Sequence, residues 1–340
     1  MLALFNEEQQ MFESTAKRLA QSIGINNPHD LNTIDRAKGW EMVTEVGLLG
    51  LRMRDNDTPL ASGVEVMIAA QALAERLVPQ PFISSLLASE LLALANAPGK
   101  LVEELAAGEV RYALLLTRDF AALAQVDDPD AVAFDCADAQ YALALKGQDL
   151  VKIGISQGFR VVDNAADLTR TLLQRDGVSG EVEVLGSLSA EAQKRWLALA
   201  LTTLAADTVG TMEGAFTGAV AYTKERVQYG ALIGSFQAIQ HMCAEMLVQV
   251  QAAHSVTCYA AWAIDELPID EALLAARTAK AYASAAAQPV TETVMQVYGG
   301  IGQTWEHIAH VYTRRAFVNA RLLGNESQQL HHIADARLGA

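Results

Sequence analysis

Two stretches in the second half of the chain carry residue types that suit an anionic nucleotide. The first is Arg226-Val-Gln-Tyr-Gly with Gln237 soon after it, and the second runs from Gln296 to the pair Gly299-Gly300. An arginine can hold a pyrophosphate through forked, charge-assisted hydrogen bonds, and glycines let a nucleotide approach the backbone closely. Each feature also has a plainer interpretation, because the glycine pair alone could end a helix and Arg226 alone could be a solvated surface charge.

A pair of histidines near the end of the chain raises the question of a metal. His307 and His310 lie three residues apart and could share one face of a helix. Two histidines without a third ligand are weak evidence for a metal, so we expect no metal site. Glu306 could instead pair with Arg314 or Arg315.

The elements that position these residues predict an α+β fold in three parts. Residues 1–107 have apolar residues at helical spacing, with Asn6 as an N-cap, and are expected to form an N-terminal helical domain. Residues 108–187 carry short β-type runs between Asp, Asn and Gly clusters, which predicts a reduced middle β domain. Residues 188–340 are helical again from Ser189 and predict an antiparallel, four-helix-bundle-like domain.

The expected elements have these bounds. Helices are expected over 65–77, 83–94, 196–226, 236–265, 271–298, 306–320 and 327–337. Six strands are expected near 112–116, 131–134, 141–145, 150–153, 159–162 and 181–184.

Composition excludes several functions. The 340 residues contain 25 Lys and Arg against 40 Asp and Glu, and this net charge of −15 is unsuited to binding nucleic acid. Three cysteines, Cys136, Cys243 and Cys258, form no metal-type spacing and indicate a reducing compartment. The acidic N-terminus does not look like a signal peptide, and the most apolar stretch, residues 196–209, contains Thr and Asp. We therefore expect a cytoplasmic protein without a membrane segment.

The two stretches resemble the signatures of the acyl-CoA dehydrogenase family. The first continues through Phe236-Gln237 to His241 and follows the pattern R-x-Q-F-G-x-x-I-x-x-F-Q-x-x-Q-H, while the second begins 70 residues after Arg226 (296 − 226). Residues 46–51 and 74–82 resemble the first helical domain of that family, and the α–β–α order is that of its fold. The resemblance implies FAD as the cofactor, with its ADP half held by a neighbouring subunit. By this resemblance, the residues that hold it are Arg226, Gln228, Tyr229, Ile233, Gln237, Gln296, Gly299 and Gly300.

The segment after the glycine pair has a more specific resemblance. Thr304-Trp-Glu-His307, followed by His310 and Arg314-Arg315, is similar to the T-W-E-H variant of the family motif. That variant is associated with short dehydrogenases that pair as unlike subunits, including those acting on steroid side chains attached to CoA.

Two parts of the family's catalytic apparatus are missing. The family removes an α-proton from an acyl-CoA with a glutamate and passes a hydride to the flavin. The two positions where that base occurs are Leu323 and Ala200 here. Asp207, about two helical turns after Ala200, is the replacement candidate, although a structural role is more usual for such an acid. The family's T-E-P-x-x-G-S-D-like run, which holds the flavin ring, is also absent. The most similar segment of the middle part begins at Thr117 and lacks the Gly-Ser pair.

The sequence therefore favours a subunit that supplies the ADP half of an FAD site to a homologous catalytic dehydrogenase in a heterotetramer. Its partners would be an acyl-CoA, with a steroid side chain or another bulky group, and an electron-transfer acceptor. One alternative is a self-sufficient homo-oligomer with an unusual base, either Asp207 or Glu326; Glu213 is a weaker candidate. Another is a flavin-free assembly or acyl-CoA-binding protein.

Overall fold

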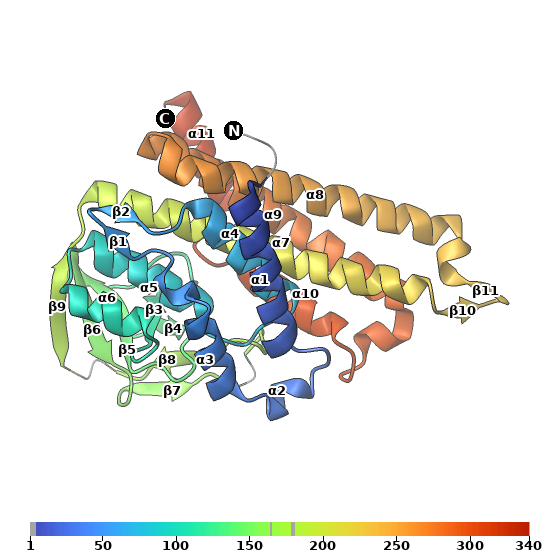
Figure 1. Cartoon of the computed structure of the whole chain (residues 1–340), viewed down its shortest axis with the longest axis horizontal. Coiled ribbons are helices and arrows are strands. Elements are labelled where there is room, and N and C mark those ends of the chain that lie inside the picture. Colours follow the sequence, from blue (N-terminus) through green and yellow to red (C-terminus); the bar gives the residue numbers. More distant parts are fainter. Residues whose placement is uncertain (1–4, 164, 178–180, 340) are drawn as a thin grey trace.

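A computed structural model describes residues 5–163, 165–177 and 181–339 of the chain. Residues 1–4, which belong to the N-terminal segment expected not to be a signal peptide, lie outside this described part. A rounded body of short helices and a sheet lies at one end, and long helices extend from it to the other (Figure 1). This arrangement confirms the expected α+β fold.

The first part of the chain is helical, as expected. Asn6 caps the first helix by accepting a hydrogen bond from the Gln9 amide at 2.8 Å, which confirms it as an N-cap. Pro81 stands directly before the fifth helix, as its role in a turn requires. The elements of this part are α1 (Glu7–Ile23), α2 (Asp30–Thr33), α3 (Arg36–Glu45), β1 (Arg54–Asp55), β2 (Thr58–Pro59), α4 (Gly63–Glu75), α5 (Phe82–Leu94) and α6 (Gly99–Ala106).

Within the described residues, the middle part forms one mixed sheet with the strand order β7-β8-β4-β3-β5-β6-β9. The pair β3 and β5 is parallel, and the other neighbours are antiparallel. The strands are β3 (Tyr112–Leu116), β4 (Val132–Phe134), β5 (Tyr141–Lys146), β6 (Asp149–Gly154), β7 (Phe159–Val161), β8 (Leu172–Arg175) and β9 (Val182–Ser187).

The expectation of six strands missed β8. This strand has only two apolar residues before Gln174 and Arg175, so its sequence gives a weak strand signal. It nevertheless pairs with both β4 and β7. The Arg175 guanidinium is buried and donates to the carbonyl oxygen of Val126, which explains why an arginine is tolerated in the strand.

The third part is the expected helical bundle. Ser189 caps its first helix by accepting from the Ala192 amide at 3.1 Å. The first helix ends at Thr223 rather than at residue 226, so Arg226 lies beyond it. The elements are α7 (Ala190–Thr223), β10 (Val227–Gln228), β11 (Ala231–Leu232), α8 (Gln237–Glu266), α9 (Ile269–Tyr298), α10 (Ala309–Asn319) and α11 (Glu326–Leu338).

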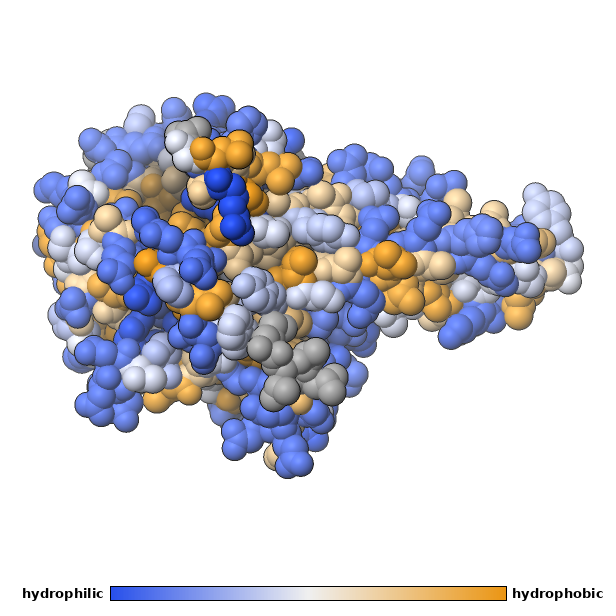
Figure 2. Space-filling view, turned by 90° about the horizontal axis from the view of Figure 1, so that it is seen from above, coloured by the Kyte–Doolittle hydropathy of each residue, from blue (hydrophilic) through white to orange (hydrophobic). Residues whose placement is uncertain are grey.

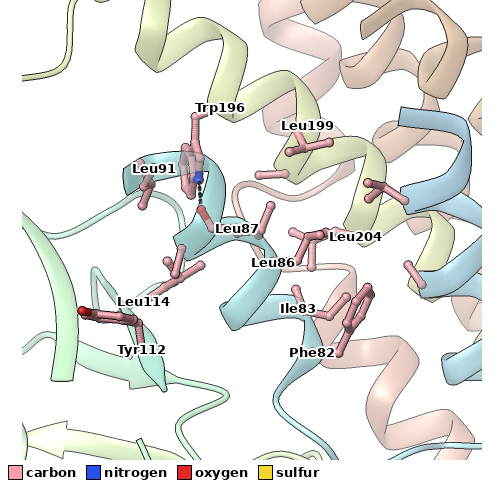
Figure 3. Close-up of a cluster of buried hydrophobic side chains, with 14 of the residues drawn as sticks. Phe82, Ile83, Leu86, Leu87, Leu91, Tyr112, Leu114, Trp196, Leu199 and Leu204 are labelled. Carbon is pink, nitrogen blue, oxygen red and sulfur yellow. Dashed lines mark hydrogen bonds between the residues drawn. The ribbon is translucent and has the colours of Figure 1, made fainter. Parts of the chain in front are cut away.

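One buried apolar core joins the three parts. Helix α5 lies between β3 and α7, where Leu86 and Leu91 pack toward Leu114 and Leu199 (Figure 3). The Trp196 indole donates to the carbonyl oxygen of Leu87 at 3.1 Å and fixes the start of α7 against α5. The proposed domain boundaries after residues 107 and 187 fall between α6 and β3 and between β9 and α7, but the interior is continuous across both.

Candidate functional site

The first nucleotide-type stretch forms a hairpin at the far end of the bundle (Figure 1). Strands β10 and β11 pair antiparallel, and the two residues between them, Tyr229 and Gly230, have φ values of 52° and 78°. Two positive φ angles in a two-residue loop are typical of a type I′ turn, which matches the twist of paired strands. The helix expected to continue to residue 226 ends at Thr223, and the hairpin that follows was not predicted from the sequence.

Arg226 stands at the base of the hairpin with its side chain exposed. Its carbonyl oxygen accepts a hydrogen bond from the Ile233 amide at 2.9 Å, which closes the hairpin. Ile233 is buried, so its side chain supports the hairpin from inside rather than facing a ligand. In the described part of the chain, no carboxylate lies within 4.0 Å of the Arg226 guanidinium. The cation is therefore available to an external anion.

The second stretch reaches the same end of the bundle. Gly299 ends α9 with φ 65°, and the Tyr298 ring before it lies 4.9 Å from the ring of Tyr222, one turn before Arg226. A Cβ on Gly299 or Gly300 would meet nothing within 4 Å, so the backbone there is open to close approach. Gln228, Gln237 and Gln296 are also exposed.

Large apolar side chains are exposed around these polar residues. Tyr229 at the hairpin tip is 96% exposed, and its ring meets Phe236 edge-on at 6.5 Å. Figure 2 shows apolar patches along the helices that project from the rounded body. Contiguous apolar surface of this kind marks interaction sites in soluble proteins. We call this end of the helical bundle the bundle tip. Its exposed apolar residues are Val227, Tyr229, Leu232, Phe236, Ile301 and Trp305.

The bundle tip fits the ADP half of FAD. It brings to one end of the bundle three amide side chains, an open glycine backbone and an arginine that has no carboxylate partner in the described ranges. A pyrophosphate needs a forked cation and backbone access, and an adenosine needs donors and acceptors with apolar surface. Of the residues expected to hold the ADP half, Ile233 is buried and the others lie at this end of the bundle; their roles stay a prediction.

The segment expected to hold the flavin ring, unlike the bundle tip, is occupied by contacts within the chain. The segment after β3 folds into a tight turn, in which the Thr117 hydroxyl donates to the Asp119 carboxylate at 2.7 Å and the Thr117 amide donates to the Ala122 carbonyl at 2.9 Å. The carbonyl oxygen of Phe120 then accepts a hydrogen bond of 2.8 Å from the amide of Leu323. The two positions at which the sequence departs from the family are therefore in direct contact.

Little space remains between these two positions. The cavity beside them has a volume of about 190 Å³ and is mostly apolar, with Ala121, Leu123, Trp196 and Leu323 in its walls. Pockets for drug-sized ligands usually span about 300 to 1,000 Å³. The residues at this position do not fit a flavin ring with an acyl-CoA beside it, and they offer no proton acceptor to a substrate.

Asp207 is surrounded by cations rather than facing a cavity. It is 1% exposed, and its carboxylate accepts hydrogen bonds from Arg315 and, at 2.6 Å, from Asn319. The Arg170 guanidinium lies 2.8 Å away. Burial alone would raise the pKa of Asp207, but the two arginines and these hydrogen bonds hold it well below its usual range. These contacts favour a structural anion over a base.

This ion-pair network joins the sheet to the bundle. Arg170 precedes β8, whereas Asp207 lies on α7 and Arg315 on α10. Sequence reasoning missed the network because its members are far apart in the chain. The available signal was a charged residue at Asp207 within an otherwise apolar helix, together with the adjacent arginines 314 and 315.

The other candidates for the catalytic base are Glu213, Glu326 and the second family position, Ala200, and none of them faces the cavity beside Leu323. Ala200 is fully buried in the core and carries no titratable group. Glu213 accepts a hydrogen bond from Gln71 at 2.7 Å, and Glu326 is exposed at the start of α11.

The histidine pair is held by local contacts. The His307 ring accepts a hydrogen bond from the Ala309 amide at 3.2 Å, and His310 Nε2 lies 3.1 Å from the Trp305 carbonyl oxygen. The part of the chain that the structure describes contains no group of three or more His, Cys, Asp or Glu residues arranged for a metal.

The expected pairing of Glu306 with Arg314 or Arg315 was wrong for the described residues. Arg315 turns inward to Asp207, and the Arg314 guanidinium lies over the Trp305 ring at 5.4 Å. Both arginines therefore have other partners.

Comparison with known proteins agrees with this geometry. Residues 191–338 match the family described as "Acyl-CoA dehydrogenase, C-terminal domain". The chain is 28% identical to acyl-CoA dehydrogenase IpdE2 of Mycobacterium tuberculosis over 96% of each protein. It is 35% identical to acyl-CoA dehydrogenase FadE34 of the same organism over 60% of this chain, a match that spans only 27% of that longer protein.

Solved structures share the fold over nearly the whole chain. The Tcur3481-Tcur3483 steroid ACAD variant superposes with a TM-score of 0.82 at 22% identity, covering 98% of each chain. A chain of the ChsE4-ChsE5 complex from Mycobacterium tuberculosis superposes with a TM-score of 0.79 at 18% identity, covering 100% of each. Residues 191–338 thus belong to the acyl-CoA dehydrogenase C-terminal domain family, and the whole chain is similar to acyl-CoA dehydrogenases, which are FAD-binding flavoproteins. Among the described residues, no helix is long and apolar enough to cross a membrane.

Proposed function

We propose that this chain is the non-catalytic subunit of a heteromeric FAD-dependent acyl-CoA dehydrogenase. Its bundle tip supplies the ADP half of an FAD site, and a homologous partner subunit supplies the flavin-ring pocket and the base. The observation that carries this proposal is the hydrogen bond from the Leu323 amide to the Phe120 carbonyl. It joins the two positions that a catalytic subunit would use for the base and the flavin ring, while Arg226 at the other site has no carboxylate partner among the described residues.

The reaction of the complex is the α,β-desaturation of an acyl-CoA. FAD, when bound, accepts the hydride and passes the electrons to an electron-transfer acceptor. This chain's own share is to bind the pyrophosphate through Arg226 and to offer the open backbone of Gly299-Gly300. An α2β2 heterotetramer built in this way contains fewer flavins than subunits.

A bulky acyl group, such as a steroid side chain attached to CoA, is the proposed substrate class. The T-W-E-H variant from Thr304 to His307 supports it by resemblance. The fold neighbours described as a steroid ACAD and as a ChsE4-ChsE5 complex are consistent with it and with an unlike partner. The cytoplasm is the proposed location, because the free thiols of Cys136, Cys243 and Cys258 suit a reducing compartment.

Two other functions have less support. A self-sufficient homo-oligomer needs a base, but the first candidate, Asp207, is held as an anion by Arg170 and Arg315. A flavin-free assembly protein leaves the unpaired Arg226 and the open glycine pair without a ligand.

The proposal is tested by co-expression with the dehydrogenase encoded beside this chain. We expect the pair to co-purify and to oxidise a bulky acyl-CoA with an artificial electron acceptor, whereas this chain alone does not. Oxidation of acyl-CoA by this chain alone would favour the homo-oligomer. A pair that forms but contains no flavin would favour the assembly protein.

A further inference from the structure

A second cavity shares no lining residue with the proposed ADP site, although Tyr298 in its wall directly precedes Gly299. Its volume is about 280 Å³, the space of roughly nine water molecules. It is bordered by the loop after α1, the end of α4, the last third of α7, the end of α9 and the start of α10, and it opens to solvent. Its walls include Arg76, Gly218, Val294, Tyr298, Ile308 and Tyr312.

Two glycines of α7 give the cavity its shape. A Cβ on Gly218 would lie 2.8 Å from the Tyr298 hydroxyl, and one on Gly214 would lie 2.9 Å from the Tyr312 hydroxyl. The missing side chains therefore let both phenol rings lie over the helix. Val294 and Ile308 add aliphatic wall, so most of the lining suits an apolar body.

Arg76 is the cation of this cavity. Its backbone is fixed at the end of α4, where its carbonyl oxygen accepts from the Ile25 amide at 3.0 Å. No carboxylate of the described chain lies within 4.0 Å of its guanidinium. A half-buried guanidinium without a partner fits a carboxylate, because its planar fork can make two parallel hydrogen bonds.

Glu75, the residue before Arg76, also lines the cavity, and its carboxyl interacts with charges on two other helices. Burial raises the pKa of its carboxyl, and so does the charge of Glu213, while Lys17 and Arg76 act in the opposite direction. Glu213 and Lys17 lie on α7 and α1, so this carboxyl forms part of the seam between those helices. Its carbonyl oxygen is engaged separately, accepting from the Tyr312 hydroxyl at 2.8 Å.

Tyr298 offers a second donor. Its hydroxyl has no hydrogen-bond partner within the described ranges, whereas that of Tyr312 is bonded to Glu75. Burial raises the pKa of Tyr298 to about 12, and the neighbouring Tyr222 adds to this, so the phenol keeps its proton at neutral pH. An unpaired phenol and an unpaired guanidinium thus line one mostly apolar cavity.

We propose that this cavity binds a small organic carboxylate with a compact apolar body, whose carboxylate pairs with Arg76 and accepts a hydrogen bond from Tyr298. The body of the ligand lies against Val294, Ile308 and the tyrosine rings. A branched aliphatic or small aromatic acid has the size that the volume allows.

Isothermal titration calorimetry on the full chain tests the proposal with three probes: benzoate, 3-phenylpropionate and 4-methylpentanoate. We expect at least one acid to bind saturably at one site, and its neutral amide to bind at least tenfold more weakly. Arg76→Gln should weaken the acid at least tenfold, and Tyr298→Phe should weaken it by a smaller factor. Ala221→Phe, which fills the cavity from its rim, should abolish binding. Arg337→Gln, an exposed arginine on α11, is the matched control and should change nothing.

Absence of saturable binding by all three acids would overturn the proposal. So would binding that survives both Arg76→Gln and Ala221→Phe, since the acid would then lie elsewhere. Circular dichroism and thermal unfolding of each variant distinguish lost binding from lost folding, and Ala221→Phe remains informative if Arg76→Gln does not fold. The result is independent of the proposed flavin function, because no FAD or partner subunit is needed.

Discussion

The amide of Leu323 donates a hydrogen bond of 2.8 Å to the carbonyl oxygen of Phe120, joining the end of the bundle to the turn after β3. Leu323 itself has φ 53° and is 5% exposed, and the Gln329 amide group donates to its carbonyl oxygen at 2.7 Å. The turn that carries a base in catalytic relatives is therefore held from both sides around an apolar side chain. In this chain, we interpret it as a structural contact.

Replacing Leu323 with Glu should not create a dehydrogenase. The carboxylate would enter an apolar cavity without a partner, so we expect Leu323→Glu to lower the free energy of unfolding by about 2 to 4 kcal/mol. Acyl-CoA oxidation by the isolated chain should stay absent. Chemical denaturation and an acceptor-linked assay measure the two effects, with Leu323→Met as the volume-matched control. Activity in the Glu variant would mean that a working flavin-ring pocket exists.

Arg226→Ala should reduce flavin retention by the complex without disturbing the fold. The side chain is exposed and unpaired, so the free energy of unfolding should change by less than about 0.5 kcal/mol. Flavin content after gel filtration, read from absorbance, should fall clearly below that of the unmodified complex. Arg337→Ala serves as the control for loss of an exposed arginine. Unchanged flavin content in Arg226→Ala would remove this residue from the site.

Asp207→Asn distinguishes a structural anion from a base. The change removes the paired carboxylate of buried Arg315 and one of the two carboxylates beside Arg170, which keeps Asp167 at 3.3 Å, so we expect a loss of about 3 to 5 kcal/mol in the free energy of unfolding. A catalytic base would show the reverse pattern, with activity lost and stability nearly kept. Because the folded pKa of Asp207 lies below the unfolded value, its stabilisation is present above about pH 4. It should disappear as the pH falls through the lower folded pKa.

The buried side chain of Lys280 should give the free energy of unfolding a second pH dependence, which arises from burial of a cation rather than from pairing of an anion. This lysine of α9 is 0% exposed and donates to the Ser284 hydroxyl at 2.9 Å and to the carbonyl oxygens of Gly324 and Ala320 at 3.2 and 3.3 Å. Burial lowers its pKa from 10.5 to about 7. Between these values the unfolded chain holds the extra proton, so the free energy of unfolding should rise with pH.

Lys280→Met tests this slope. The rise, of up to about 1.4 kcal/mol per pH unit, should be lost in the variant between pH 7.5 and 10, while other titrating groups affect both proteins alike. Urea denaturation at a series of pH values measures the difference. Parallel curves for the two proteins would mean that Lys280 keeps an ordinary pKa in the folded chain.

Local signals predicted most of the fold. Asn6 and Ser189 began their helices where capping chemistry requires, and Gly299 ended α9. The sequence was less informative where tertiary pairing overrides weak local preference. Strand β8 exists because β4 and β7 flank it, and the hairpin beyond Thr223 depends on a type I′ turn formed by Tyr229, a residue uncommon at positive φ.

The candidate site shows the same division. The motif from Arg226 to Gln237 located the bundle tip, because its residue types and spacing lie within one continuous stretch. Neither the contact between Phe120 and Leu323 nor the ion pair between Asp207 and Arg315 could be predicted in this way. Each joins residues more than one hundred positions apart, and the partner of a buried charge is fixed only by the packed structure.

The ratio of FAD to protein tests most directly whether this chain supplies only half of an FAD site. FAD and protein are quantified together in this chain purified alone and in its complex with the partner dehydrogenase, using the flavin absorbance band after release from the protein. We expect essentially no FAD on the chain alone and fewer FAD molecules than chains in the complex, with the flavin content of the complex falling when Arg226 is replaced by Ala. One FAD bound by every copy of the isolated chain, with acyl-CoA oxidation, would contradict it.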